Sequence, residues 1–187
     1  CIELSFKPLA IEKCGNFVSF GGRGTCGGYW CVLWRLSRKE FESQKGDTNK
    51  LPMKTIVAAG EVPGILVYHK FKAIVGVHLH PGAGTLVIEV PYSLAVDDQQ
   101  CWSIACLFIK KPFRKKGVST ELLLAAAVYA KSQGAELMEG YPVEPKVEQQ
   151  IPAAFAWAGI SKTFISAGFR EIVRRSPTRP VMRLELN

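Results

Sequence analysis

The sequence lacks the features that mark membrane-spanning and secreted chains. Its longest unbroken apolar run, residues 122–130, is far shorter than the ~18 apolar residues that a helix needs to cross a bilayer. No charged segment followed by an apolar stretch opens the chain, so we expect no signal peptide. No internal repeat or low-complexity tract is present either. We therefore expect a cytoplasmic protein without a membrane partner.

The sequence also lacks a set of residues with the spacing of a metal site. None of its 6 cysteines forms a C-x-x-C pair, and zinc would need two more ligands besides Cys26 and Cys31. The other candidates are His78 and His80, which alternate along an expected strand and there are more often polar residues on its open face. We predict no metal and reduced, intracellular thiols.

Basic residues exceed acidic ones, which favours an anionic partner. The chain has 24 Lys and Arg against 16 Asp and Glu, for a net charge of +8. Nucleic acid, anionic lipid and a phosphorylated cofactor would all suit this balance. However, many basic residues cluster at one turn, residues 110–116, and no aromatic RNA-binding signature is present. A small phosphorylated ligand is therefore favoured, and nucleic acid is not expected.

That basic turn lies between a strand and a helix, and the rest of the chain is organised around it. Residues 102–109 form an apolar run of strand length, stopped by Lys110, Lys111 and Pro112. Good helix formers follow from Val118, and Gly134 supplies a typical helix end. The pattern predicts a buried strand, a basic turn and a long helix.

The start of this helix is a candidate anion site. Unpaired backbone amides and the positive end of the helix dipole converge at a helix amino terminus, where phosphate can bind. The alternative is that the turn is only a solvated basic surface. The residues concerned are Arg114, Lys115, Lys116, Gly117, Val118, Ser119 and Thr120.

The run Arg114-Lys-Lys-Gly117-Val-Ser119 resembles the hallmark of the GCN5-related N-acetyltransferases (GNAT). In that family an Arg/Gln-x-x-Gly-x-Gly/Ala loop joins a strand to a helix, and its amides hold the pyrophosphate of acetyl-coenzyme A (acetyl-CoA). Ser119 takes the last small position here. The resemblance covers about residues 62–187. Residues 1–60 are similar, through Cys26 to Arg35, to the amino-terminal part of one bacterial branch, so we predict a single domain over 1–187.

Strands and helices alternate along the chain and a hairpin closes it. This order predicts a mixed sheet covered by helices. Together with the resemblance, it implies an α/β (α+β) fold with a mostly antiparallel central sheet of about six to seven strands, helices on both faces and a splayed strand pair at the cofactor cleft. The expected strands are 29–36, 64–68, 73–80, 102–109, 136–141, 169–174 and 180–186, and the expected helices are 37–46, 51–59, 118–133 and 161–167.

The resemblance implies how the acyl carrier would bind. The backbones of Leu107 and Ile109 would pair with the pantetheine arm, and the strand at 136–141 would splay away to leave a gap for the thioester. A backbone amide near Leu107 or Phe108 would then meet the oxyanion of the tetrahedral intermediate. The side chains of these residues would belong to the core.

Glu139, on the second splayed strand, is the candidate general base, and Glu144 is the second choice. The alternative for Glu139 is a structural ion pair, because buried carboxylates are usually paired. Many family members protonate the leaving thiolate with a tyrosine where this chain has Phe164. Phe164 would pack on the pantetheine or in the core, and the residues that could replace the tyrosine are Ser161, Ser166 and Tyr141.

The sequence thus predicts an N-acetyltransferase that moves an acetyl group from acetyl-CoA to a primary amine on a small molecule or peptide, as a monomer or homodimer. The alternative is a non-catalytic acyl-CoA-binding protein. The loop at 81–100 is a candidate substrate wall, since loops of this length usually serve a function. Aromatic residues, in part from the core, could line an acceptor pocket: Tyr29, Trp30, Trp34, Trp102 and Trp157.

Overall fold

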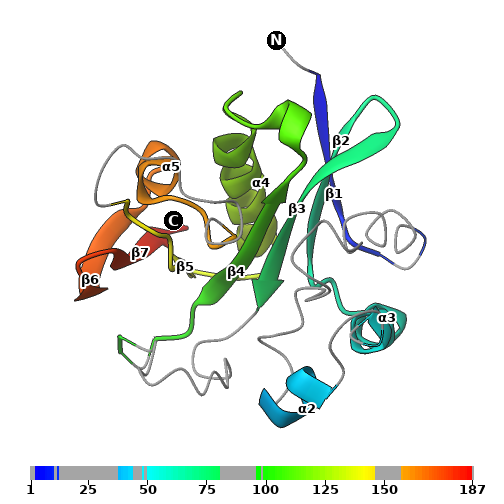
Figure 1. The fold of residues 1–187 in the computed structure, drawn as a ribbon, viewed down its shortest axis with the longest axis horizontal. Helices are drawn as coiled ribbons and strands as arrows, with labels where there is room; N and C mark the ends of the chain where they lie inside the picture. The colour runs from blue at the N-terminus through cyan, green and yellow to red at the C-terminus, as the bar shows by residue number, and fades with distance from the viewer. Residues whose placement is uncertain are drawn as a thin grey trace.

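The computed structural model describes residues 3–10, 12, 38–43, 48, 50–80, 96–97, 99–145 and 157–186. Within these ranges seven strands form one sheet in the order β1-β2-β3-β4-β5-β7-β6 (Figure 1). All neighbouring strands are antiparallel except β4 and β5, which are parallel. The strands are β1 Leu4–Pro8, β2 Gly64–His69, β3 Lys72–His80, β4 Trp102–Ile109, β5 Leu137–Gly140, β6 Arg170–Ser176 and β7 Arg179–Glu185. The predicted mixed, mostly antiparallel sheet is confirmed.

Most expected elements in these ranges form within a few residues of their predicted bounds. The helices are α2 Arg38–Ser43, α3 Lys50–Ala58, α4 Val118–Ser132 and α5 Ser161–Ser166, with a short 3-10 turn, η4, at Lys111–Phe113. Gly60, Gly134 and Gly168 follow α3, α4 and α5 with left-handed φ of 87°, 83° and 91°. The strand expected at 29–36 lies outside the described residues.

Strand β1 is the element that the sequence pattern did not reveal. It pairs with β2 from Leu4↔His69 to Pro8↔Ile65 and forms one edge of the sheet. Only Leu4 and Phe6 are large apolar residues in it, and Pro8 ends it. Proline is tolerated there because an edge strand has one side without a ladder.

The main core lies between the sheet and helices α4 and α5, which contact each other (Figure 1). One stripe of α4 is fully buried, as its apolar spacing predicted: Leu122, Ala126 and Ala130 are each 0% exposed. Phe164 of α5 and Met138 of β5 complete this layer, and both are also 0% exposed. The basic turn before α4 is therefore held by a helix that is anchored along its length.

Strands β4 and β5 pair over only three residues and then diverge. The parallel ladder runs from Trp102↔Met138 to Ile104↔Gly140, although β4 continues to Ile109. On its other edge β4 carries an extra residue, because Leu79 pairs with Ile104 while the preceding β3 residue pairs with Cys106. Such a bulge bends a strand and commonly lies beside a functional site. The predicted splayed pair is thus present at β4 and β5.

Phe164 fills the space beneath this divergence, which makes Gly140 sensitive to substitution. A Cβ added to Gly140 would lie 2.7 Å from Phe164 Cζ and closer still to Cε1. We predict that Gly140→Ala lowers the free energy of unfolding, measured by urea denaturation, by about 1–3 kcal/mol because the core is overpacked. Val128→Ala, at a position that is 71% exposed on α4, should change it by less than about 0.5 kcal/mol. Equal effects of the two substitutions would contradict the close packing of Phe164 on Gly140.

Candidate functional site

The amino end of α4 is open to solvent and carries no side-chain cap. Its N-cap residue, Gly117, has a left-handed φ of 77° and provides no side-chain cap for this 15-residue helix, and its carbonyl accepts from the Thr120 and Glu121 amides at 2.9 and 3.3 Å. Gly117, Lys115 and Lys116 are exposed, whereas Val118 is buried. An open amino end with exposed lysines beside it suits an anionic group.

The other basic residues of the turn fix its shape. Arg114 Nε donates to the Ile109 carbonyl at 2.8 Å, and Lys110 Nζ donates to the Ala73 carbonyl at 2.8 Å. Lys115 adopts a left-handed φ of 58°, which reverses the chain before the helix. Arg114 and Lys110 thus attach the turn to β4 and β3. Lys115 and Lys116 are exposed, and Lys116 Nζ lies 6.0 Å from the centroid of the Phe113 ring.

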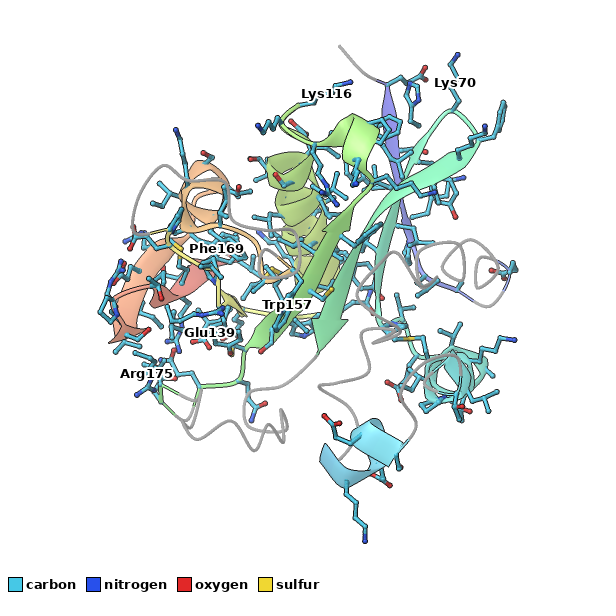
Figure 2. All side chains as sticks on the ribbon, in the orientation of Figure 1. Lys70, Lys116, Glu139, Trp157, Phe169 and Arg175 are labelled. Atoms are coloured by element: carbon cyan, nitrogen blue, oxygen red, sulfur yellow. The ribbon has the colours of Figure 1, made fainter. Side chains whose placement is uncertain are left out.

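The gap between β4 and β5 holds a segment of the chain itself, residues 157–160, which we call the wedge segment. The Leu107 amide donates to the Trp157 carbonyl at 2.7 Å. On the other side, Val143 forms an isolated parallel bridge with Ile160, and its amide donates to the Gly159 carbonyl at 2.9 Å. The wedge segment therefore lies between β4 and the continuation of β5. In Figure 2, Lys116, Trp157 and Glu139 follow one another from the upper to the lower part of the view.

The direction of the β4 amides distinguishes the two predicted oxyanion donors. Successive amides of a strand point to opposite edges. The Lys110 amide donates to Ile74 of β3 at 3.1 Å, and the Leu107 amide points the other way, to Trp157. Phe108 shares the direction of Lys110, so its amide faces β3. Of the two predicted oxyanion donors, Leu107 directs its amide into the gap and Phe108 does not. The Ile109 amide points the same way as that of Leu107.

Phe164 lies in the core beside the gap. It is 0% exposed and meets Phe169 edge-to-face, with 5.1 Å between ring centroids. A Cβ on Gly159 would lie 2.8 Å from its Cε2 atom, so the ring touches the glycines on both sides of the gap, Gly140 and Gly159. The position where many family members carry a tyrosine hydroxyl is therefore occupied by a core phenyl ring.

Glu139 lies in a row of paired residues at the closed end of the gap. It pairs with Ser103 of β4 and Arg183 of β7, so the three side chains share one face of the sheet. The Glu139 side chain is 2% exposed. Arg183 donates to its Oε1 from Nε at 2.9 Å and from Nη2 at 2.5 Å, and the Tyr141 hydroxyl donates to Oε2 at 3.0 Å. The contacts are those of a buried ion pair, and a role as base stays a prediction.

Arg183 continues this network toward the surface. Its Nη1 and Nη2 atoms donate to the Asp97 carboxylate at 2.8 and 3.0 Å, and Nη1 also donates to Gln99 Oε1 at 3.0 Å. Hydrogen bonds from the guanidinium hold the pKa of Asp97 below its ordinary value. Arg183 thus joins the segment that leads into β4 to the buried carboxylate of β5. The ion pair is the alternative expected for Glu139, but its partner Arg183 could not be predicted because the pairing depends on strand register.

Burial keeps two further groups of this cluster protonated. It raises the pKa of the Cys101 thiol to about 12, with the charge of Glu139 as the next cause. Burial also raises the pKa of Tyr141, and Glu139 again adds to the shift. The Tyr141 oxygen is 3.4 Å from Ser103 Oγ. Tyr141 therefore remains a hydrogen-bond donor at neutral pH.

The other residues considered as acid or base lie apart from this cluster. Glu144 pairs with Arg174, which also binds Glu171, and both carboxylates are partly exposed. Ser166 is exposed and donates to the Lys162 carbonyl at 2.9 Å. Ser161 is 6% exposed at the start of α5, where its amide donates to Val143.

Part of the predicted site falls outside the described residues. Tyr29, Trp30, Trp34, the cysteine pair at 26 and 31, and most of the loop at 81–100 belong to this part. Trp102 packs against Tyr129 of α4 with 6.0 Å between ring centroids, which places it with the core. In the described ranges no group of three or more His, Cys, Asp or Glu could hold a metal ion. In the same ranges no helix is long and apolar enough to cross a membrane.

The buried ion pair between Glu139 and Arg183 can be tested through the stability of the protein. Arg183→Met should lower the free energy of unfolding by about 3 kcal/mol, because it leaves a buried carboxylate without its cation. The double variant Glu139→Gln/Arg183→Met should recover more than half of that loss in the same urea denaturation.

Arg174→Met is the matched control, because its partners Glu144 and Glu171 are partly exposed. It should leave the unfolding midpoint nearly unchanged. If the double variant were no more stable than Arg183→Met alone, the ion pair would not account for the effect.

Comparison with known proteins assigns the family. Residues 54–147 match the sequence pattern described as "Acetyltransferase (GNAT) family". No curated protein sequence matches the chain.

Three solved structures illustrate the shared fold. PaiA N-acetyltransferase from Thermoplasma acidophilum, in complex with coenzyme A, is 14% identical with a TM-score of 0.54 and covers 98% of this chain and 99% of its own. The polyamine N-acetyltransferase of Drosophila melanogaster is 9% identical, with a TM-score of 0.59 and coverage of 98% and 100%. A GNAT acetyltransferase from Streptococcus pneumoniae is 13% identical, with a TM-score of 0.58 and coverage of 99% and 100%. The matched pattern spans half of the chain, and the chain therefore belongs to the GNAT acetyltransferase family.

Proposed function

We propose that the protein is an acetyl-CoA-dependent N-acetyltransferase that moves the acetyl group directly to a primary amine. The observation that carries this proposal is the amino end of α4, which has no side-chain cap and follows β4 in the chain. Strand β4 pairs with β5 over only three residues and then diverges from it. The first feature suits a diphosphate and the second leaves a strand edge for the pantetheine arm. Cytoplasmic location and a monomeric or homodimeric state stay predictions.

The cofactor would lie along three consecutive parts of the site. The pyrophosphate would bind the amides from Gly117 to Ser119, with Lys115 and Lys116 balancing its charge. The Thr120 amide already donates to the Gly117 carbonyl at 2.9 Å. The pantetheine arm would follow the edge of β4 to which the Leu107 and Ile109 amides point. The acyl group would then lie at the closed end of the gap, near the Leu107 amide. The coenzyme A complex of the Thermoplasma protein, which shares the fold, supports acyl-CoA as the donor.

The transfer itself would need little covalent chemistry from the protein. The neutral amine attacks the thioester carbonyl, the Leu107 amide donates to the resulting oxyanion, and the C–S bond breaks to release coenzyme A as its thiolate. A thiol with a pKa of ~8.5 leaves without strong assistance. The amine proton passes to a base, for which we propose Glu139, one residue before the last β4–β5 pair. The Tyr141 hydroxyl donates a hydrogen bond to Glu139 at 3.0 Å, so it would be the hydroxyl beside the proposed base.

The acceptor would be a primary amine on a small molecule or a peptide. The Drosophila protein, which shares the fold, is described as an enzyme that forms N-acetylagmatine. That name supports an amine acceptor as a class. Among the described residues, two carboxylates, Glu139 and Asp97, share the Arg183 guanidinium, so this cluster carries a net negative charge that suits a cationic amine.

A non-catalytic acyl-CoA-binding protein is the second candidate. Two observations favour it: Phe164 offers no hydroxyl, and the Leu107 amide already has the Trp157 carbonyl as acceptor. Such a protein would bind acetyl-CoA but release no thiol with any amine. A panel of primary amines, assayed for free thiol with saturating acetyl-CoA, separates the two functions.

The diphosphate site can be tested at Gly117. Gly117→Glu should weaken acetyl-CoA binding, measured by calorimetry, by at least about 100-fold, because it brings a carboxylate to the phosphates and removes the close backbone approach. The control Gly117→Asn has a side chain that tolerates φ of 77°, and in the described part of the chain no atom beyond the two neighbouring residues lies within 4 Å of a Cβ there. It should bind within about tenfold of the native chain. Unchanged affinity in a folded Gly117→Glu variant would contradict the placement of the site.

The role of Glu139 can be tested through turnover. Glu139→Gln keeps the hydrogen-bonding shape but cannot accept a proton, so we expect turnover with a reactive amine to fall by about 100-fold. The dissociation constant of acetyl-CoA should stay nearly constant. Glu144→Gln is the control and should retain most of the turnover. An unchanged rate across pH in Glu139→Gln would exclude Glu139 as the base.

A further inference from the structure

The wedge segment occupies the edge of β4 that the proposed function assigns to the acyl-pantetheine arm. Trp157 accepts from the Leu107 amide at 2.7 Å, the distance of a strong hydrogen bond. The segment also pairs with Val143, so it bridges both sides of the gap like a short extra strand. Ala158, at its centre, is 6% exposed. The chain's own backbone thus takes the place of a ligand arm.

One amide cannot serve both partners. A backbone N–H directs its single hydrogen to one acceptor at good geometry, so the Leu107 amide cannot bind the Trp157 carbonyl and a reacting acyl oxygen at full strength. Either the wedge segment moves when the cofactor binds, or the Leu107 amide is not the oxyanion donor.

We propose that the wedge segment is a displaceable internal occupant of the acyl site, and that acetyl-CoA binding breaks the bond between the Leu107 amide and the Trp157 carbonyl. This inference rests on the proposed function. In the free protein the reactive amide is then shielded from water, and it becomes available only when the acyl carrier takes the place of the segment. The contact is autoinhibitory: part of the binding free energy of the cofactor is used to undock the segment.

The wedge segment has a feature that lets it move. Gly159 has a left-handed φ of 82°, and a Cβ there would lie 2.8 Å from Leu107 Cδ1 and 2.8 Å from Phe164 Cε2. The docked position therefore requires glycine both for its backbone angle and for its close contacts. The Ser161 amide, bonded to the Val143 carbonyl at 3.1 Å, holds the following helix in place, so Gly159 and Ile160 are the positions for a hinge.

A through-hydrogen-bond NMR experiment tests the proposal directly on the native chain. In the free protein the scalar coupling between the Leu107 nitrogen and the Trp157 carbonyl carbon should be observed. We expect it to disappear at saturating acetyl-CoA, with large shifts of both resonances. If acetyl-CoA binds by calorimetry and the coupling persists, this inference is overturned together with the role of the Leu107 amide as oxyanion donor, whereas acetyl transfer to an amine stands as the proposed function. If acetyl-CoA does not bind, both are overturned.

A substitution that weakens docking provides an independent measurement. Gly159→Ala should tighten acetyl-CoA binding by about fivefold or more, because the left-handed alanine and its crowded methyl disfavour only the docked state. Gly60→Ala is the matched control, because Gly60 has φ of 87° and, among the residues that the structure describes, none beyond its two chain neighbours has an atom within 4 Å of a Cβ there. It should lower the melting temperature without changing cofactor affinity. Weaker acetyl-CoA binding in a folded Gly159→Ala protein would show that the segment is a wall of the site and would overturn the proposal.

Discussion

The structure depends on the early end of the pairing between β4 and β5. Two local features end it: Ala105 is extra on β4, where the register with β3 shifts, and Pro142 follows β5 and has no amide to donate. Beyond Ile104 and Gly140 the two strands separate, and β4 has one edge without its neighbour. The proposed pantetheine and acyl sites use that edge, because a strand edge is the part of a sheet that can pair with something new.

The two ends of the gap differ in charge and in burial. At the open end, Lys115 and Lys116 are exposed beside helix amides, so an anion bound there would still be partly hydrated. At the closed end, Glu139 is 2% exposed and is compensated by Arg183. A buried charge is stable only while its partner is present. The pair of Glu139 and Arg183 therefore limits both the stability of the fold and the protonation that Glu139 could undergo in a reaction. In the proposed complex, this difference in charge and burial would orient an acyl-CoA with its phosphates outward and its reacting end inward.

The sequence predicted the elements that depend on local patterns and missed those that depend on register. The bounds of β4 and the stop of α4 at Gly134 follow from apolar runs and from a left-handed glycine, which are encoded within a few residues. Arg183 and Glu139 are 44 positions apart, and they meet only because β7 pairs with β5 in one register. The contact between Trp157 and Leu107 has the same origin. No periodicity within either segment contains that information.

Phe164 shows why a motif position can be lost without loss of the fold. Its ring meets Gly140 and Gly159 from opposite sides, and its Cζ atom would be 2.7 Å from a Cβ on Gly140. A tyrosine hydroxyl on that atom would be buried with the ring, which is 0% exposed, and a buried polar group needs a partner. In this chain the Phe164 ring instead packs against Gly140 and Gly159, the glycines on the two sides of the gap. If the protein transfers acetyl groups, the thiolate must therefore leave without a proton donor at this position, which a thiol of ordinary acidity permits.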